Sequence, residues 1–109
     1  MGLDQYAFAR KEGQEDNQIM YWRKHSDLEG WMSDLYQGRG GKGEFNCVEL
    51  KLTEEDLQRL ELEYRSLKEA RGFFWGQSQP EDNDSTEDFL TLAYKAIDDG
   101  YEIIYTSWW

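Results

Sequence analysis

The chain has 109 residues, of which 23 are acidic and 12 are Lys or Arg, so its formal net charge is −11 at pH 7. This charge excludes nucleic acid and anionic membranes as direct partners, because their phosphates must be neutralised by cationic side chains. The length fits one domain (residues 1–109), and no apolar run approaches the ~20 residues of a membrane span. We therefore expect a single cytoplasmic domain, with five Trp, seven Tyr and five Phe supplying much of its core.

The first third of the chain predicts a hairpin and then a helix. Alternating side-chain sizes predict strands at 5–10 and 18–23. Ser26 and Glu29 have the spacing of a capping box, and apolar residues then recur with helical spacing, so we expect a helix that ends near Gly38. A glycine-rich loop follows it.

The middle of the chain predicts a strand and a long helix. Aromatic and β-branched residues predict the strand at 44–52, and Thr53 is in position to cap a helix that runs to Gly72. The apolar segment 72–76 lies between two glycines and predicts a buried strand or a tight turn.

The last third predicts one more helix and one more strand. Ser85 or Thr86 can cap a helix that Gly100 closes, and the apolar groups on both faces of 101–107 predict a strand inside the sheet. The sequence thus predicts an α+β fold: a mixed or mainly antiparallel sheet of four to five strands with about three helices packed mainly on one face.

No catalytic or metal-binding motif stands out. His25 is the single histidine and has no cluster of metal-ligand spacing around it, so a structural or exposed role is favoured over general-base chemistry. Cys47 cannot form an internal disulfide, and its apolar neighbours predict a buried, inert thiol. We expect no catalytic residue, no metal and no cofactor, and the sequence favours a protein that is not an enzyme.

A small basic and aromatic cluster stands out in this acidic chain. It precedes a predicted helix N-terminus, which attracts anions, and the cations of the glycine-rich loop return near it if the helix is short. The candidate ligand-binding residues are Tyr21, Trp22, Arg23, Lys24, His25, Arg39 and Lys42. The competing interpretation is that the cations pair with the many carboxylates.

An acidic cluster begins after the only proline. Five carboxylates within eight positions, with no base among them, could imitate phosphates for a basic partner or simply be a solvated loop and first helical turn. The candidate partner-binding residues are Glu81, Asp82, Asp84, Glu87 and Asp88.

Several aromatic residues lead to specific expectations. Trp22, Trp31, Phe74 and Trp75 lie within the strongest apolar patterns and are expected to join helix to sheet. The final pair, Trp108–Trp109, either folds back over the core or forms an exposed aromatic patch that marks an interface.

Five segments together resemble an uncharacterised family of small proteins of bacteriophages and bacteria. They are Met1-Gly2-Leu3-Asp4-x-Tyr6, Tyr21-Trp22-Arg23-Lys24, the helix with Trp31, Gly72-Phe73-Phe74-Trp75-Gly76 and Tyr105-x-Ser107-Trp108-Trp109. Some phage members carry the label phosphoglycerate kinase, which this chain does not fit, because it has neither the length nor a nucleotide motif. The resemblance implies a phage-like origin and no established activity.

Charge, size and resemblance together favour a non-enzymatic accessory protein that binds and modulates a host or defence protein with a basic surface. The alternative is a protein that binds or sequesters a small anionic, nucleotide-like ligand at the basic cluster. An enzyme ranks third, because it would need a site that forms only in three dimensions.

Overall fold

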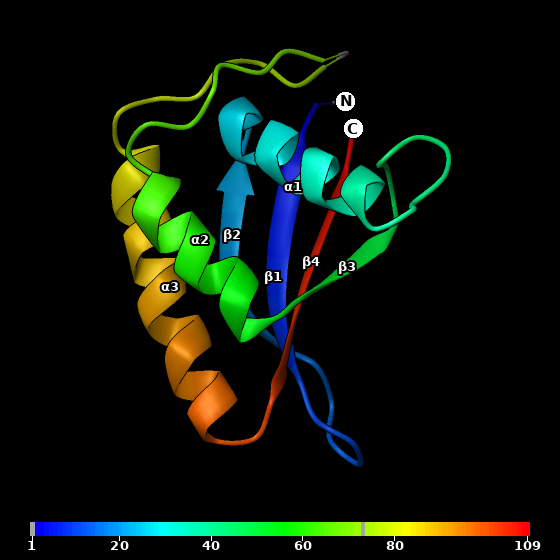
Figure 1. Cartoon of the computed structure of the whole chain (residues 1–109), viewed down its shortest axis with the longest axis vertical. Coiled ribbons are helices and arrows are strands. Elements are labelled where there is room, and N and C mark those ends of the chain that lie inside the picture. The colour runs from blue at the N-terminus through cyan, green and yellow to red at the C-terminus, as the bar shows by residue number, and fades with distance from the viewer. Residues whose placement is uncertain (1, 73) are drawn as a thin grey trace.

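The computed structural model describes residues 2–72 and 74–109, and within them four strands form one antiparallel sheet. The strand order is β2-β1-β4-β3, so the first and last strands of the chain pair at the centre of the sheet (Figure 1). This confirms that the C-terminal strand lies inside the sheet. The strands are β1 (Asp4–Arg10), β2 (Asn17–Arg23), β3 (Glu49–Leu52) and β4 (Glu102–Trp108).

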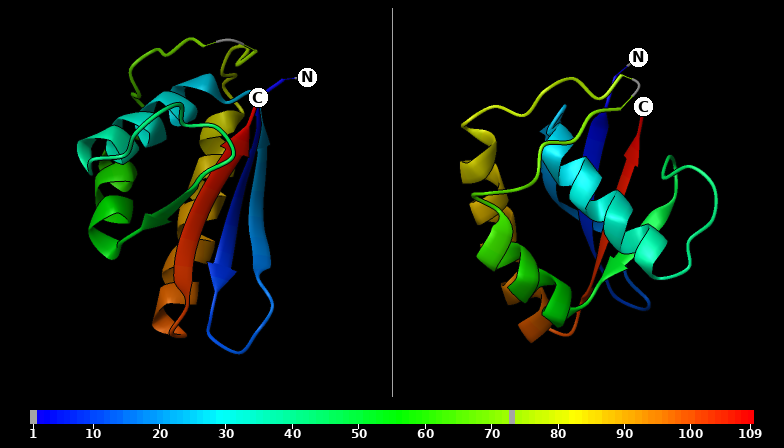
Figure 2. Two further views of the ribbon diagram at one scale, coloured as in Figure 1. Left: turned by 90° about the vertical axis from the view of Figure 1, so that its right-hand side faces the viewer. Right: turned by 45° about the horizontal axis from the view of Figure 1, so that its top comes forward.

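Three helices pack on one face of the sheet, and among the described residues no helix covers the opposite face (Figure 2). α3 (Asp82–Asp98) packs on β2, β4 and β1, and α2 (Glu54–Glu63) lies beside α3. α1 (Ser26–Gly38) crosses the end of the sheet at which both chain termini lie (Figure 1). The α+β class with helices on one face is thus confirmed. We call the two sides of the sheet the helical face and the open face.

The side chains of β1 distinguish the two faces. Gln5, Ala7 and Ala9 are buried on the helical face, whereas Tyr6 and Phe8 lie half-exposed on the open face. Alanine side chains are short, so they allow a helix to pack closely on the centre of the sheet. The large aromatic side chains of this strand are consequently left on the side without helices.

Three aromatic rings form the centre of the core. Trp22 of β2 packs edge-on against Phe89 of α3, with 5.2 Å between ring centroids, and its ring lies 6.1 Å from that of Tyr105 in β4. Each of these side chains is at most 2 % exposed. Such rings bury a large apolar area and dominate the energetics of a small core. Aliphatic side chains from the helices surround them: Leu28, Met32, Leu57, Leu60 and Leu90.

The predicted start of α2 is confirmed, and its predicted end is wrong. The Thr53 hydroxyl accepts a hydrogen bond from the Asp56 amide, and the Asp56 carboxylate accepts one from the Thr53 amide. The helix ends at Glu63, well before the predicted end. The next residues have good helix propensity, but tertiary contacts override it, since the Ala70 amide donates to Asp27 Oδ1 at 3.0 Å.

Two further boundaries differ from the prediction. β3 has only four residues, and shortly before it the chain turns at Cys47, whose φ of 59° is left-handed. Cys47 is exposed, so the predicted burial is wrong. α3 begins at Asp82, so neither Ser85 nor Thr86 is its N-cap. The Thr86 hydroxyl instead donates to the Asp82 carbonyl one turn earlier, at 2.8 Å.

Of the four predicted aromatic anchors, only Trp22 is a fully buried core residue. Trp31 is half-buried: its ring lies 5.4 Å from the Arg59 guanidinium, and its Nε1 donates to Glu63 at 3.2 Å. Trp31 therefore covers the edge of the core rather than filling it.

In the apolar segment, the Trp75 amide donates a hydrogen bond to the Gly72 carbonyl at 3.1 Å, and the described residue Phe74 lies in a turn. Phe74 is 43 % exposed and Trp75 is half-buried, so the predicted burial of this segment is wrong. Phe73, which belongs to the same segment, lies outside the described residues.

The two tryptophans should therefore differ in their contribution to stability. Trp22→Ala should lower the free energy of unfolding by about 3–5 kcal/mol, the range for deleting a large aromatic from a packed core. Trp31→Ala should cost only about 1–2 kcal/mol, because part of its surface and its cation–π contact are at the protein surface. Urea unfolding curves of both variants measure the difference. Equal losses would show that Trp31 is as deeply packed as Trp22.

Candidate functional site

The connection between α2 and α3 crosses over the start of α1, and we call its described residues within 65–80 the strap (Figures 1 and 2). The strap supplies the cap that α1 lacks. His25 occupies the N-cap position without a side-chain capping bond, whereas Ser78 Oγ accepts a hydrogen bond from the Asp27 amide at 2.9 Å. The Asp27 carboxylate in turn accepts from the Ala70 amide of the strap. Strap and helix thus fix each other's position.

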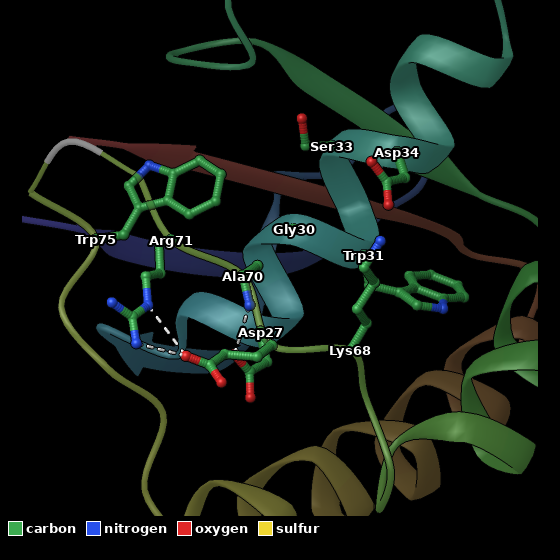
Figure 3. A pocket seen from close by; sticks show the side chains of 10 residues that line it. Asp27, Gly30, Trp31, Ser33, Asp34, Lys68, Ala70, Arg71 and Trp75 are labelled. Atoms are coloured by element: carbon green, nitrogen blue, oxygen red, sulfur yellow. Dashed lines mark hydrogen bonds and ion pairs between the residues drawn. The ribbon is translucent and has the colours of Figure 1, made fainter.

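A hollow of about 290 Å³ opens between α1 and the strap (Figure 3). Trp75 lies at one end of it and Trp31 at the other, with Gly30 of α1 between them. A side chain at Gly30 would overlap the Ala70 side chain, so glycine is needed where the two segments meet. Charged groups of both signs line the hollow: Asp27, Asp34, Lys68, Glu69 and Arg71.

The neighbouring end of the sheet has an unusual backbone. Lys24, Cys47 and Phe74 have φ values of 59°, 59° and 67° and are the only non-glycine residues in the described parts of the chain with positive φ. All three lie at this end. The Lys24 amide donates to the Leu3 carbonyl, the Leu3 amide to the Phe74 carbonyl, and the Cys47 amide to the Ser107 carbonyl, at 2.8–3.0 Å. Such conformations cost about 1–3 kcal/mol each and cluster at functional sites, which makes this end the candidate site.

The seven predicted ligand-binding residues do not meet in one place. Tyr21 and Arg23 lie on the open face, where both donate to Asp4 Oδ1, at 2.6 and 3.4 Å. Trp22 is buried in the core. Lys24 lies against the strap, next to the candidate site.

His25 is buried beneath the strap and is 2 % exposed. Its Nδ1 lies 2.6 Å from Ser78 Oγ and 3.8 Å from Asp82 Oδ2, and its Nε2 has no hydrogen-bond partner among the described residues. Burial lowers the pKa of His25, although the nearby carboxylates raise it, so the ring is mainly neutral at pH 7. In a Ser-His-Asp triad the hydroxyl and the carboxylate bind opposite ring nitrogens. Here both face Nδ1, so the geometry is that of a buried helix cap.

Arg39 and Lys42 lie beyond the other end of α1. A helix of 13 residues is about 20 Å long, so the condition of a short helix is not met and these two cations do not return near His25. The Arg39 guanidinium forms an ion pair with the Asp56 carboxylate and donates to the Lys51 carbonyl at 2.6 Å. These contacts hold the loop after α1 against the start of α2.

A carboxyl group held by hydroxyls lies between α1 and β4. Glu29 is fully buried: its Oε1 accepts from the Tyr105 hydroxyl at 2.7 Å and its Oε2 from the Ser107 hydroxyl at 2.8 Å. It is therefore not part of the predicted capping box. The Gln5 amide nitrogen extends the network from Tyr105 to the His25 carbonyl. Burial raises the pKa of Glu29 to about 7, although these hydrogen bonds lower it.

Glu29 should make stability depend on pH. Its pKa in the fold exceeds the ordinary value of 4.5, so folding disfavours the ionised form, and stability falls as pH rises from about 4.5 to about 7. A shift of this size corresponds to roughly 3 kcal/mol at most. Glu29→Gln should therefore be more stable than the parent at pH 8 and should lose that advantage at pH 5, as measured by urea unfolding.

The exposed Glu12→Gln is the matched control for this change and should follow the parent at both pH values. A Glu29→Gln protein that is less stable than the parent at pH 8 would show that the ionised carboxylate stabilises the fold.

The five predicted partner-binding carboxylates lie in the first turns of α3 and just before them. Glu81, Asp84 and Asp88 are exposed to solvent. Asp82 accepts a hydrogen bond from a strap amide at 2.6 Å, and Glu87 bonds to the tyrosine and arginine that follow α2. Three of the five thus lie on the surface, and the other two help to hold the helices.

The net charge is unevenly divided between the faces of the molecule. α2 together with residues 81–99 carries 12 of the 23 carboxylates but only two of the 12 cations, Arg59 and Lys95. The rest of the chain holds 11 carboxylates and ten cations and is nearly neutral. We call 54–63 and 81–99 the acidic layer, and almost the whole net charge resides there.

Within the described residues, no group of three or more His, Cys, Asp or Glu side chains could hold a metal ion. None of the described helices combines the length and apolar character needed to cross a bilayer. Comparison with protein-family models, with curated proteins and with solved structures finds no match for this chain in any of the three. Function must therefore be inferred from the surfaces themselves.

Proposed function

We propose that this chain is a non-enzymatic accessory protein that binds and modulates a protein partner through its acidic layer. The observation that supports this is the concentration of nearly all the net charge on two adjacent helices. A partner with a basic surface would be attracted over a long range, which accelerates association and selects against acidic competitors. The same layer would repel nucleic acid.

The resemblance to phage proteins supplies the proposed setting. In this proposal the protein acts in the cytoplasm of a host cell on a host or defence protein. Proteins that bind nucleic acid have the basic surfaces that such a layer requires, because their own ligands present rows of phosphates. Carboxylates on α2 and α3 would occupy the place of those phosphates.

The exposed acids of α3 provide the test. A triple variant, Glu81→Gln, Asp84→Asn and Asp88→Asn, removes three negative charges from the acidic layer. The immobilised parent should retain a protein from host lysate at low salt and release it at about 0.5 M salt, where charges are screened within a few ångströms. The triple variant should retain at least about tenfold less, since several interfacial charges are lost together.

A matched control removes the same charge elsewhere. Glu12→Gln, Glu15→Gln and Glu44→Gln change exposed acids outside the acidic layer and should retain the partner like the parent. If both triple variants lost the same amount of retained partner, the binding would be non-specific ion exchange. Retention of no protein by the parent would contradict the proposal.

A second function is favoured by the hollow beside α1, which would suit a small ligand with an aromatic ring and an anionic group. Two indole rings, Trp31 and Trp75, line it for stacking, and Lys68 and Arg71 offer cations. Arg71 pairs with Glu69 two residues away, and both side chains are largely exposed, so a ligand anion could replace that carboxylate.

Thermal unfolding in the presence of nucleotides tests this second function. A ligand present at 100 times its Kd should stabilise the protein by about 2.7 kcal/mol and raise the Tm. Arg71→Gln should abolish the shift without changing the Tm of the free protein, whereas Lys95→Gln, on α3, should keep it. The absence of a shift with nucleoside mono-, di-, tri- and cyclic phosphates, or an equal shift in both variants, would eliminate this function.

A further inference from the structure

The open face of the sheet carries a cluster of four aromatic rings. Tyr6 lies at its centre, with ring centroids 4.6 Å from Trp108, 5.2 Å from Tyr21 and 6.2 Å from Phe8. The rings come from three neighbouring strands, β1, β2 and β4. Tyr21 and Trp108 remain 42 % and 45 % exposed. A contiguous aromatic surface is thus left in water.

This surface is exceptional for the protein. The chain is strongly polar, with a mean hydropathy of −0.92, and the helical face already buries its main core. On the open face, Ile104 lies opposite Phe8 in the sheet and is itself 96 % buried, whereas Tyr21 and Trp108 remain 42 % and 45 % exposed. Exposed aromatic patches of this kind mark sites of association.

The charges on the open face are nearly balanced. Its strands carry three cations, and each is paired: Arg10 with Glu49 and with Asp16, both at 2.8 Å, Arg23 with Asp4 at 3.4 Å, and Lys51 with Glu102 at 2.9 Å. Three cations and four carboxylates give this face a net charge of only −1, in contrast to the acidic layer on the other side of the molecule.

The low net charge of the open face indicates which kind of partner could bind there. Nucleic acid needs cations that are free to neutralise phosphates, and here each cation is already engaged. A basic or an acidic partner would gain little net attraction. A second copy of the same face meets no such mismatch, because a face with almost no net charge does not repel its own copy, and a two-fold axis through the aromatic cluster sets the rings of one copy against those of the other.

The area of the face suits a reversible dimer. Strands about 4.8 Å apart with residues about 3.4 Å apart give three strands of seven residues and one of four a flat area of roughly 400 Å² per copy. Two such faces lie at the low end of protein interfaces, where complexes are weak or transient. Two copies meeting in this way would keep the acidic layers on their outer sides, separated from the interface by at least the ~10 Å diameter of a helix.

We propose that the open face is a dimerisation surface, with Tyr6, Phe8, Tyr21 and Trp108 of two copies packed at its centre and the three ion pairs at its rim. The dimer displays two acidic layers that face in opposite directions. This inference does not rest on the proposed function, since it uses the other face of the sheet.

Sedimentation velocity over about 1–500 μM protein, the range in which weak interfaces dissociate, tests the dimer. The parent should shift from monomer to dimer as concentration rises. Tyr21→Thr with Trp108→Thr should raise the dissociation constant at least about tenfold, because exposed aromatic anchors dominate such interfaces. Threonine keeps good strand propensity, and urea unfolding confirms that the variant is folded.

The matched control is Leu62→Gln with Leu92→Gln, which removes exposed apolar side chains, 85 % and 42 % exposed, from the helical side. It should dimerise like the parent. A parent that stays monomeric throughout, or a control that dissociates as readily as the aromatic variant, would overturn the proposal.

Salt provides a second measurement that needs no variant. Because each copy carries a charge of −11 and the interface is nearly neutral, added salt should screen repulsion and strengthen the dimer. Binding through the acidic layer should weaken under the same conditions, so failure of one proposal is distinguishable from failure of the other. Binding of a single-stranded oligothymidine by a parent protein that stays monomeric would instead make the face a base-stacking platform and overturn the dimer.

Discussion

The hydrogen bonds that hold the Glu29 carboxyl group against β4 position α1, and the rest of the site depends on that helix. α1 orients Asp27, which holds the strap at Ala70, and its first amides are capped by Ser78. A leucine in place of Glu29 would pack well but would leave the hydroxyls of its two partners unsatisfied in the core. The buried carboxyl group thus gives α1 one defined position at the expense of stability at neutral pH.

The two faces of the sheet separate two kinds of interaction. Helices need a polar outer surface, and in this chain the surface of α2 and α3 carries most of the net negative charge. The open face combines aromatic rings with nearly balanced charges. Attraction through the acidic layer acts at a distance and is screened by salt, whereas contact through the open face is short-ranged and depends on shape and apolar area. Because they lie on opposite sides, the two surfaces can be occupied at the same time.

The features that the sequence predicts correctly depend on residues that are close together in the chain. The N-cap of α2, Thr53, is adjacent in the chain to the helix that it caps and is predicted correctly, as is the position of the last strand. Ser78 was missed because the amide that it caps is 51 residues away, and nothing in its own polar loop marks it. Glu29 was misassigned because an i, i+3 spacing from Ser26 fits a capping box equally well whether the carboxylate faces the helix end or the sheet.

The residues of the candidate site show the same difference between local and distant contacts. Three exposed acids of α3 were recognised from local composition, but the predicted ligand cluster was dispersed because helix length separates Arg39 from His25 by about 20 Å. Each of the two alternatives expected for the terminal tryptophans is found, one for each residue. Trp108 joins the exposed aromatic cluster, whereas Trp109 folds back, with its Nε1 donating to the Phe45 carbonyl and its ring edge-on to Trp75. Neighbouring residues along an extended chain point to opposite sides. This alternation alone does not predict which of the two tryptophans is exposed.

The pairing of β1 with β4 has a consequence for the order in which the protein folds. Residues 4–10 find their central partner only in residues 102–108, so the middle of the sheet cannot close until residues 102–108 have left the ribosome. Contacts so distant in sequence slow folding, because the loop between them must be ordered first. Until then the β1–β2 hairpin exposes both the aromatic open face and the edge that β4 will occupy. The nascent chain is therefore most exposed to aggregation just before its last strand is added.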